Sequence, residues 1–125
     1  MNAVLQSDFG NFEIIWDKNS SIYSQIIAHI SLEEKANNIQ DEIFFYQYEL
    51  DIPFDGTEKE IFEEGDIVYW RSQKEANKFG ILFMYGNTTY GSGKNPQTSS
   101  PGIKIGTISN YKDLEKIKTG STLKI

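Results

Sequence analysis

Seven consecutive residues of this chain, Phe79 to Tyr85, read FGILFMY and include no charged side chain. Successive side chains of a strand point to opposite faces of its sheet, so this run is apolar on both faces. A strand of that kind must be covered on both sides, which places it at the centre of a sheet. The fold is therefore constrained to put other elements on either side of this segment.

Strand signals recur along most of the chain, as short runs rich in aromatic and β-branched residues separated by turn residues. A Phe-Gly-Asn turn at residues 9–11 joins the first two runs into a predicted β-hairpin. Residues 86–102, rich in Gly, Ser and Thr, predict a long loop. The predicted strands are Val4–Asp8, Phe12–Trp16, Ile43–Leu50, Ile67–Trp70, Phe79–Tyr85, Ile103–Ile108 and Ser121–Ile125.

Helical patterns are few and short. Ile22 and Ile26 fall on one helical face behind the capping segment 17–21, which predicts a helix of about ten residues. Residues 111–117 predict a second short helix, and residues 32–36 favour a helix by propensity alone. About seven or eight strands with two short helices predict an all-β domain, a barrel whose ends the helices plug.

Length and composition exclude several classes of protein. A chain of 125 residues suits a single domain, here residues 1–125. The chain has no cysteine, no signal-peptide pattern at its start, and no apolar run close to the ~20 residues of a membrane span. We therefore expect a cytoplasmic protein without disulfides that does not enter a membrane.

Charge is distributed unevenly about the formal net charge of −6. Residues 33–66 hold twelve acidic and two basic side chains, a sum of −10, whereas residues 67–125 hold nine basic and three acidic ones, a sum of +6. The acidic part would repel nucleic acid, so no nucleic-acid partner is expected. Both parts are typical of solvated surfaces, and a partner recognised through the acidic surface is the alternative.

One segment, Gly65–Trp70 with the sequence GDIVYW, is similar to the Gly-Asp-apolar-x-Tyr-Trp motif of the small prokaryotic cyclophilin-like proteins of unknown function. Segments 40–45, 81–86 and 100–108 resemble further motifs of that family, in the same order and at similar spacing. The resemblance implies a closed cyclophilin-like β-barrel of about eight strands. It also implies that residues 33–39 form a strand, against their helical propensity.

The chain departs from the family pattern at two places. Arg71-Ser72-Gln73 stands where the family has Pro-Pro-Gly, and the connection that follows is longer. Met84-Tyr85-Gly86 stands where the family has Phe-Phe-Gly. Both departures lie where the rim of a pocket is expected, so a relative's ligand does not transfer directly to this chain.

The mouth of a barrel is a common ligand site, and Tyr85, at the exit of the central strand, can place its hydroxyl there. Tyr69 and Trp70 are adjacent and point to opposite faces, so core packing is the alternative role for each. Glu42 begins an aromatic strand and can face the same pocket. The predicted ligand-binding residues are Glu42, Phe45, Tyr69, Trp70, Phe83, Tyr85 and, on a lid, Tyr90.

These residues predict a module that binds an unidentified small molecule or peptide and carries no evident catalytic set. The alternative is a peptidyl-prolyl isomerase that uses the same apolar cup, although the donor it would aim at the prolyl nitrogen is not evident. Arg71, the only arginine, lies in the departing segment. We expect no cofactor and no metal, because His29 is the sole histidine and the acidic pairs lack the spacing of a calcium loop. Whether the protein is an enzyme, and its oligomeric state, stay open.

Overall fold

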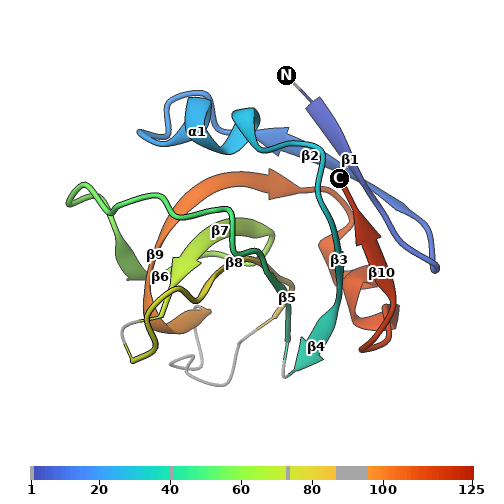
Figure 1. Ribbon diagram of the computed structural model, residues 1–125. Coiled ribbons are helices and arrows are strands. Elements are labelled where there is room, and N and C mark those ends of the chain that lie inside the picture. Colours follow the sequence, from blue (N-terminus) through green and yellow to red (C-terminus); the bar gives the residue numbers. More distant parts are fainter. Residues whose placement is uncertain (1, 40, 73, 87–95) are drawn as a thin grey trace.

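The computed structural model describes residues 2–39, 41–72, 74–86 and 96–125. Within these ranges the chain forms ten strands and two short helices (Figure 1). The helices are α1 (Tyr23–Ala28) and the 3-10 helix η1 (Tyr111–Lys116), and neither is long and apolar enough to cross a membrane. The strands are β1 (Asn2–Gln6), β2 (Asn11–Trp16), β3 (Glu33–Lys35), β4 (Asn37–Ile39), β5 (Glu42–Tyr46), β6 (Lys59–Ile61), β7 (Asp66–Arg71), β8 (Phe79–Met84), β9 (Gln97–Ile108) and β10 (Thr122–Lys124).

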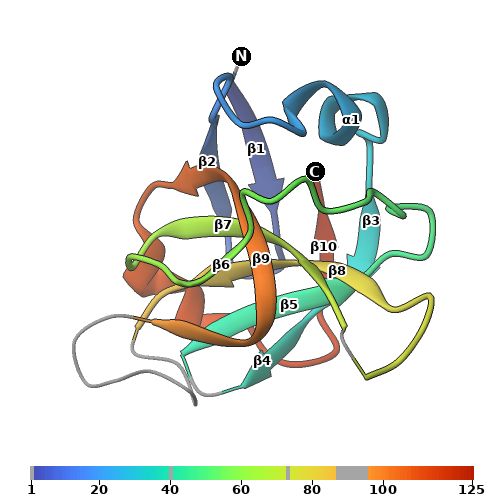
Figure 2. The same cartoon turned by 90° about the vertical axis from the view of Figure 1, so that its left-hand side faces the viewer.

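All ten strands belong to one sheet, which rolls around a common core (Figures 1 and 2). The strand order is β3-β10-β1-β2-β9-β7-β8-β5-β4, and β6 pairs with β9 beside this path. The central strand predicted from the apolar run is β8, which lies between β7 and β5. All six of its residues are buried, so the prediction of a strand covered on both faces is confirmed.

The predicted closed barrel is not confirmed, because no ladder joins the two ends of the sheet within the described residues. The end strands β3 and β4 are instead consecutive halves of one extended segment, which pairs with β10 by its first half and with β5 by its second half. Between the halves, Ala36 donates its N–H to the carbonyl of Ser121 (2.8 Å) and accepts the N–H of Gly120 (2.9 Å). Chain continuity, rather than a ladder, therefore holds the ends of the sheet together.

Residues 33–39 form strands, as the family resemblance implied and helical propensity did not. Lys35 lies opposite Thr122 in one ladder, and Asn37 lies opposite Phe44 in the other. These pairings satisfy the backbone polar groups of the segment. The gain outweighs the few tenths of a kcal/mol per residue, roughly, by which side-chain propensity separates helix from strand.

The boundaries of three other elements differ from the predictions. Strand β9 begins at Gln97, inside the predicted loop, and its first part pairs with β6, where Lys59 lies opposite Gly102. The sequence hid this strand because two of its buried side chains are the polar Thr98 and Ser100. The first helix is shorter than predicted, six residues in α1, and the second is a 3-10 helix.

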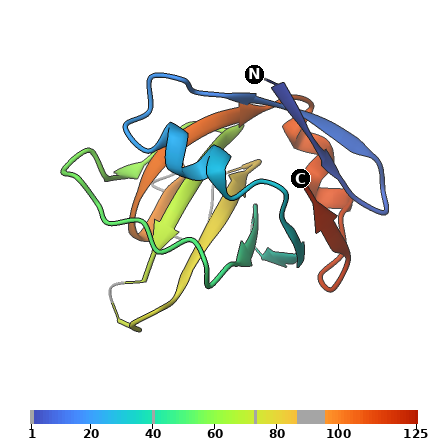
Figure 3. The same cartoon turned by 45° about the horizontal axis from the view of Figure 1, so that its top comes forward.

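Buried side chains form two separate clusters. The main core fills the inside of the rolled sheet, and α1 with the residue before it covers one end of this core through Ile26 and Ile22 (Figure 3). We call the side of β5, β8 and β7 that faces the main core the interior face, and the opposite side the outer face. The outer face carries the second cluster, which consists of Phe62, Val68, Leu82 and Met84 with the partly buried Phe44 and Trp70.

Candidate functional site on the outer face of the sheet

Three of the predicted ligand-binding residues lie on the interior face. Phe45 on β5, Phe83 on β8 and Tyr69 on β7 are at most 1% exposed. The rings of Phe45 and Phe83 are 6.3 Å apart between centroids and pack against each other within the main core. The alternative role stated for Tyr69, core packing, is the environment that the structure shows for all three.

The hydroxyl of Tyr69 is fully engaged by the segment that follows β5. It donates to the carbonyl of Leu50 (2.5 Å) and accepts the backbone N–H of Ile52 (2.9 Å). Burial raises the pKa of this phenol, so it stays a neutral donor. The hydroxyl therefore anchors residues 50–52 across this end of the core and is not turned toward an open mouth.

Arg71 completes the same network. Its Nη1 lies 2.7 Å from Oδ1 of Asp51 and 2.9 Å from the carbonyl of Ile52, and its guanidinium stacks over the ring of Phe79 at 4.5 Å. Stacked and paired in this way, the guanidinium fixes the segment after β5 to the end of β7. Its Nη1 donor is thus engaged by groups of the protein itself.

Tyr85 follows β8 and is half-buried. Its hydroxyl donates to Oδ1 of Asn38 (2.5 Å), while Nδ2 of Asn38 donates to the carbonyls of Ile117 (2.6 Å) and Glu115 (3.2 Å). Burial, with a smaller effect of the nearby Asp41 carboxylate, raises the pKa of Tyr85. The two side chains thus join β4, the end of β8 and η1. Tyr90, the remaining predicted lid residue, lies outside the described residues.

The outer face of the same three strands is organised in rows by the strand register. Phe44 on β5 lies opposite Leu82, which lies opposite Val68 on β7. One row along, Tyr46 and Trp70 lie opposite Gly80 from its two sides. In the other direction Glu42 lies opposite Met84. Of the predicted site residues, the outer face therefore holds Glu42 and Trp70.

Gly80 lets the aromatic side chains of this face come together. It carries no side chain, and a Cβ added to it would lie 2.2 Å from the carbonyl oxygen of Phe45. Over this glycine the rings of Tyr46 and Trp70 approach to 6.2 Å between centroids. The ring of Phe44 meets that of Tyr46 edge to face at 5.5 Å. The three rings are half-buried, so each keeps part of its surface open to a ligand.

Glu42 stands at the end of this aromatic surface. Burial alone raises the pKa of its carboxyl to about 7. In the ranges that the structure describes, no basic side chain forms an ion pair with it. Asp66, on the same side of β7, differs: its carboxylate pairs with Lys104 (3.1 Å) and accepts the N–H of Glu63 (2.9 Å). Glu42 is thus a half-buried acid with a pKa raised to about 7, and it lies two residues along β5 from Phe44, on the same side of the sheet as the three rings.

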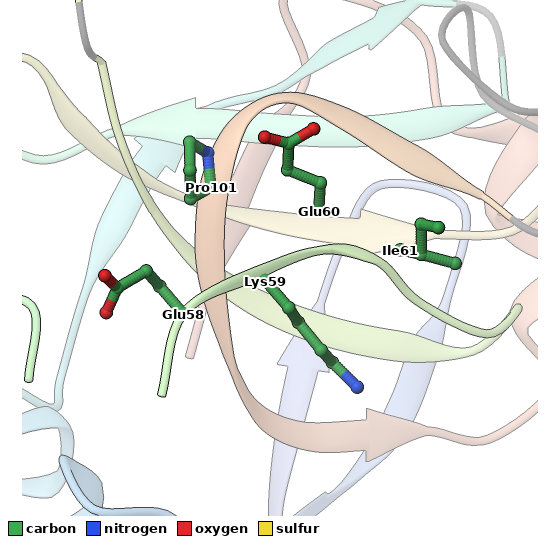
Figure 4. A pocket seen from close by; sticks show the side chains of 5 residues that line it. All are labelled: Glu58, Lys59, Glu60, Ile61 and Pro101. Carbon is green, nitrogen blue, oxygen red and sulfur yellow. The ribbon is translucent and has the colours of Figure 1, made fainter. Parts of the chain in front are cut away.

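A hollow of about 420 Å³ lies at the edge of the sheet near β6 (Figure 4). It is lined by Glu58, Lys59, Glu60, Ile61 and Pro101, and its β6 side chains are exposed. None of the predicted site residues that the structure describes lines it. Among the described residues no three acidic or histidine side chains come close enough to hold a metal ion.

Sequence reasoning missed two residues of the outer face, Phe44 and Tyr46. The signal was present in the run Ile43-Phe44-Phe45-Tyr46, because alternation along a strand must place two of these residues on each face. Of this run, the predicted site included only Phe45, which faces the interior. Gly80 carried the other signal, since a glycine inside an apolar strand marks a close approach of backbone.

Comparisons with known proteins agree with one another at the level of the fold. A family described as cyclophilin-like matches residues 3–125. The solution structure of a hypothetical protein from Archaeoglobus fulgidus superposes with a TM-score of 0.76 at 22% sequence identity, over 99% of this chain and 92% of that one. A search of curated proteins finds no match.

Proposed function

This chain belongs to the cyclophilin-like family, and we propose that it is a binding module that takes a small molecule or a short peptide segment on its outer face. The observation that carries the proposal is the half-buried acid at Glu42, on the same side of the sheet as the rings of Phe44, Tyr46 and Trp70. Desolvated rings with one polar anchor are the usual composition of a ligand site. The proposal moves the predicted site from a barrel mouth to the side of the sheet.

The interior residues support this site without forming it. Phe45, Phe83 and Tyr69 fix the three strands from beneath, and their polar atoms are satisfied within the protein. A ligand there would have to displace core side chains, at a cost of several kcal/mol by the measure of core truncations, roughly 3–5 for a phenylalanine. The outer face exposes ring surface at no such cost.

A screen of metabolites and short peptides by thermal stabilisation tests the proposal, because a ligand that binds only the folded chain raises its melting temperature. Each hit is then followed by ¹H–¹⁵N NMR of the two indole N–H groups. We expect a hit to shift the Trp70 signal and to leave that of Trp16, which is buried in the main core, unchanged. Phe44→Ala should weaken binding, and Tyr48→Ala, at a side chain 78% exposed, should not.

The isomerase alternative is separated by a second measurement on the same samples. The protein is added to a peptide with one X-Pro bond, and the exchange between cis and trans is followed by NMR. Because Arg71 is engaged by Asp51 and Ile52, we expect no acceleration of that exchange. Acceleration that is lost on Phe44→Ala would assign catalysis to the outer face. Hits that shift only buried signals would overturn the proposed site.

A further inference from the structure

The outer face has an acid whose charge nothing in the described chain balances. Glu42 lies between Ile39 of β4 and Met84 of β8, both apolar, and forms no ion pair with a described basic residue. Asp66 is an acid with a structural role in the same sheet. One of its carboxylate oxygens forms an ion pair with Lys104, and the other accepts a backbone N–H. A half-buried carboxylate without such partners is complementary to a cation from outside.

The rings of this region already accept cations from the chain itself. The Nζ of Lys78 lies 4.7 Å from the centroid of the Tyr46 ring, and the Nζ of Lys59 lies 5.2 Å from that of Phe62. Both distances are within the range, about 6 Å, over which an ammonium group is attracted to the face of an aromatic ring. Aromatic surface here therefore binds positive charge in two separate places.

The strand register brings the Glu42 carboxylate and the Phe44 ring within reach of one small group. Glu42 and Phe44 are two residues apart on the same side of β5, about 6.6 Å along the strand, and Tyr46 is one such step further. Trp70 closes the aromatic end from β7. A substituted ammonium group can thus meet a ring and the carboxylate together.

Resting on the proposed function, we propose that the ligand of the outer face is an organic cation. Its alkylated ammonium group is held between the carboxylate of Glu42 and the ring of Phe44, and the rest of the ligand extends toward the rings of Tyr46 and Trp70. A hard metal ion is excluded by the donor set, because one carboxylate and three rings do not coordinate it. An anionic ligand would meet a segment, residues 33–66, whose formal charge sums to −10, whereas a cation is attracted to it.

The test compares choline with its uncharged isostere 3,3-dimethyl-1-butanol, which has the same shape and lacks the charge. Each is titrated into the full chain while the indole N–H of Trp70 and the side-chain carboxyl carbon of Glu42 are followed by NMR. We expect choline to shift both signals and to bind at least about tenfold more tightly than the isostere, as one neutralised charge at a ring site provides. Trp16 is the internal control.

Three variants test which groups recognise the charge. Glu42→Gln keeps the size of the side chain and should weaken choline about tenfold while leaving the isostere unchanged. Glu49→Gln, at an exposed acid, should change neither. Phe44→Leu keeps the face apolar and removes one ring, so it should weaken choline more than the isostere. Unchanged choline affinity in Glu42→Gln would overturn the proposal.

The outcomes separate this inference from the proposed function. If the isostere, or an uncharged hit from the screen, shifts Trp70 as strongly as choline does, the outer face is a binding site and its preference for cations is refuted. If neither charged nor uncharged probes shift Trp70, and the screen gives no hit there, both proposals fail together.

Discussion

The two faces of β5, β8 and β7 are built from the same short sequences and differ in how completely their side chains are buried. On the interior face Phe45, Phe83 and Tyr69 are at most 1% exposed, and the one polar atom among them, the Tyr69 hydroxyl, has partners on several sides. On the outer face the rings of Phe44 and Trp70 are half-buried, and the acid Glu42 lacks an ion-pair partner among the described residues.

This contrast indicates where the fold can hold a ligand site. A core side chain whose polar atoms are hydrogen-bonded and whose surface is fully packed contributes to stability. It has no free surface or polar group with which to bind a ligand. The outer face keeps unpaired charge and open ring surface, at a cost in stability, because the interior face holds the strands in place. Substitutions that act on one face only should therefore separate stability from binding.

The largest effect is expected from removing a ring of the interior face. Phe83→Ala should lower the free energy of unfolding by about 3–5 kcal/mol, because the cavity left in the main core cannot collapse. Phe44→Ala, the matched change on the outer face, should cost about 1 kcal/mol, since its ring is only half-buried. Urea unfolding of both variants measures the difference. Equal losses would contradict the division between the faces.

A smaller effect is expected from the buried hydroxyl. Tyr69→Phe leaves the ring in place and removes the group that bonds to Leu50 and Ile52, so it should cost about 2–3 kcal/mol. Hydrogen exchange should show faster opening of residues 50–52 in this variant. Tyr48→Phe, at an exposed side chain, is the control and should be neutral. If Tyr69→Phe were neutral too, the hydroxyl would not anchor that segment.

The acid of the outer face should make stability depend on pH. Burial raises the pKa of Glu42 from 4.5 to about 7, so the folded protein retains this proton at pH values where the unfolded chain has lost it. The cost of ionising Glu42 is present in full above the folded pKa and disappears as the pH falls to the unfolded pKa. Glu42→Gln should therefore raise the free energy of unfolding by about 1–2 kcal/mol near pH 8 and by much less near pH 5.

Urea unfolding of the wild type and Glu42→Gln at the two pH values measures this, and the titration of the Glu42 carboxyl carbon by NMR measures the pKa directly. The other acids contribute equally to both proteins, so the difference isolates Glu42. Glu49→Gln should show no such pH dependence. A Glu42 titration midpoint near 4.5 would show that the carboxyl is solvated and would remove the contrast between the faces.

The smallest effect is expected at Tyr85. Tyr85→Phe removes one hydrogen bond to Asn38 from a half-buried side chain and should cost about 0.5–1.5 kcal/mol. Asn38→Ala should cost more, because it leaves the carbonyls of Ile117 and Glu115 without their donor. Melting temperatures of the two variants rank them. The reverse order would show that Asn38 acts chiefly through Tyr85.

The fold was predictable where the pattern of side chains decides it. The strand β8 follows from its unbroken apolar run, and the hairpin of β1 and β2 follows from its turn residues. The opposite orientation of Tyr69 and Trp70 follows from alternation. The carboxylate of Asp66 likewise accepts the N–H of Glu63, three residues before it in the sequence. Each of these features depends on residues that are close together in the sequence, so the sequence alone is enough to predict it.

Features that depend on distant partners were not predictable from propensity. Residues 33–39 are strands because β10 and β5 pair with them, and only the family resemblance indicated this. The start of β9 is polar, and it forms a strand because it pairs with β6. The sequence predicts a site at a barrel mouth because the alternation of side chains shows which residues share a face of the sheet, but not which face the core covers. The segment after β5, with Leu50 and Ile52 buried, fills one end of the core.

The extended segment at residues 33–39 has a consequence for the kinetics of folding. It joins β10 to β5, and one of its contacts, between Lys35 and Thr122, spans 87 positions of sequence. Bringing such distant residues together costs loop-closure entropy before any contact repays it. Pairing this segment with β10 therefore carries a loop-closure cost that the local hairpin of β1 and β2 does not carry.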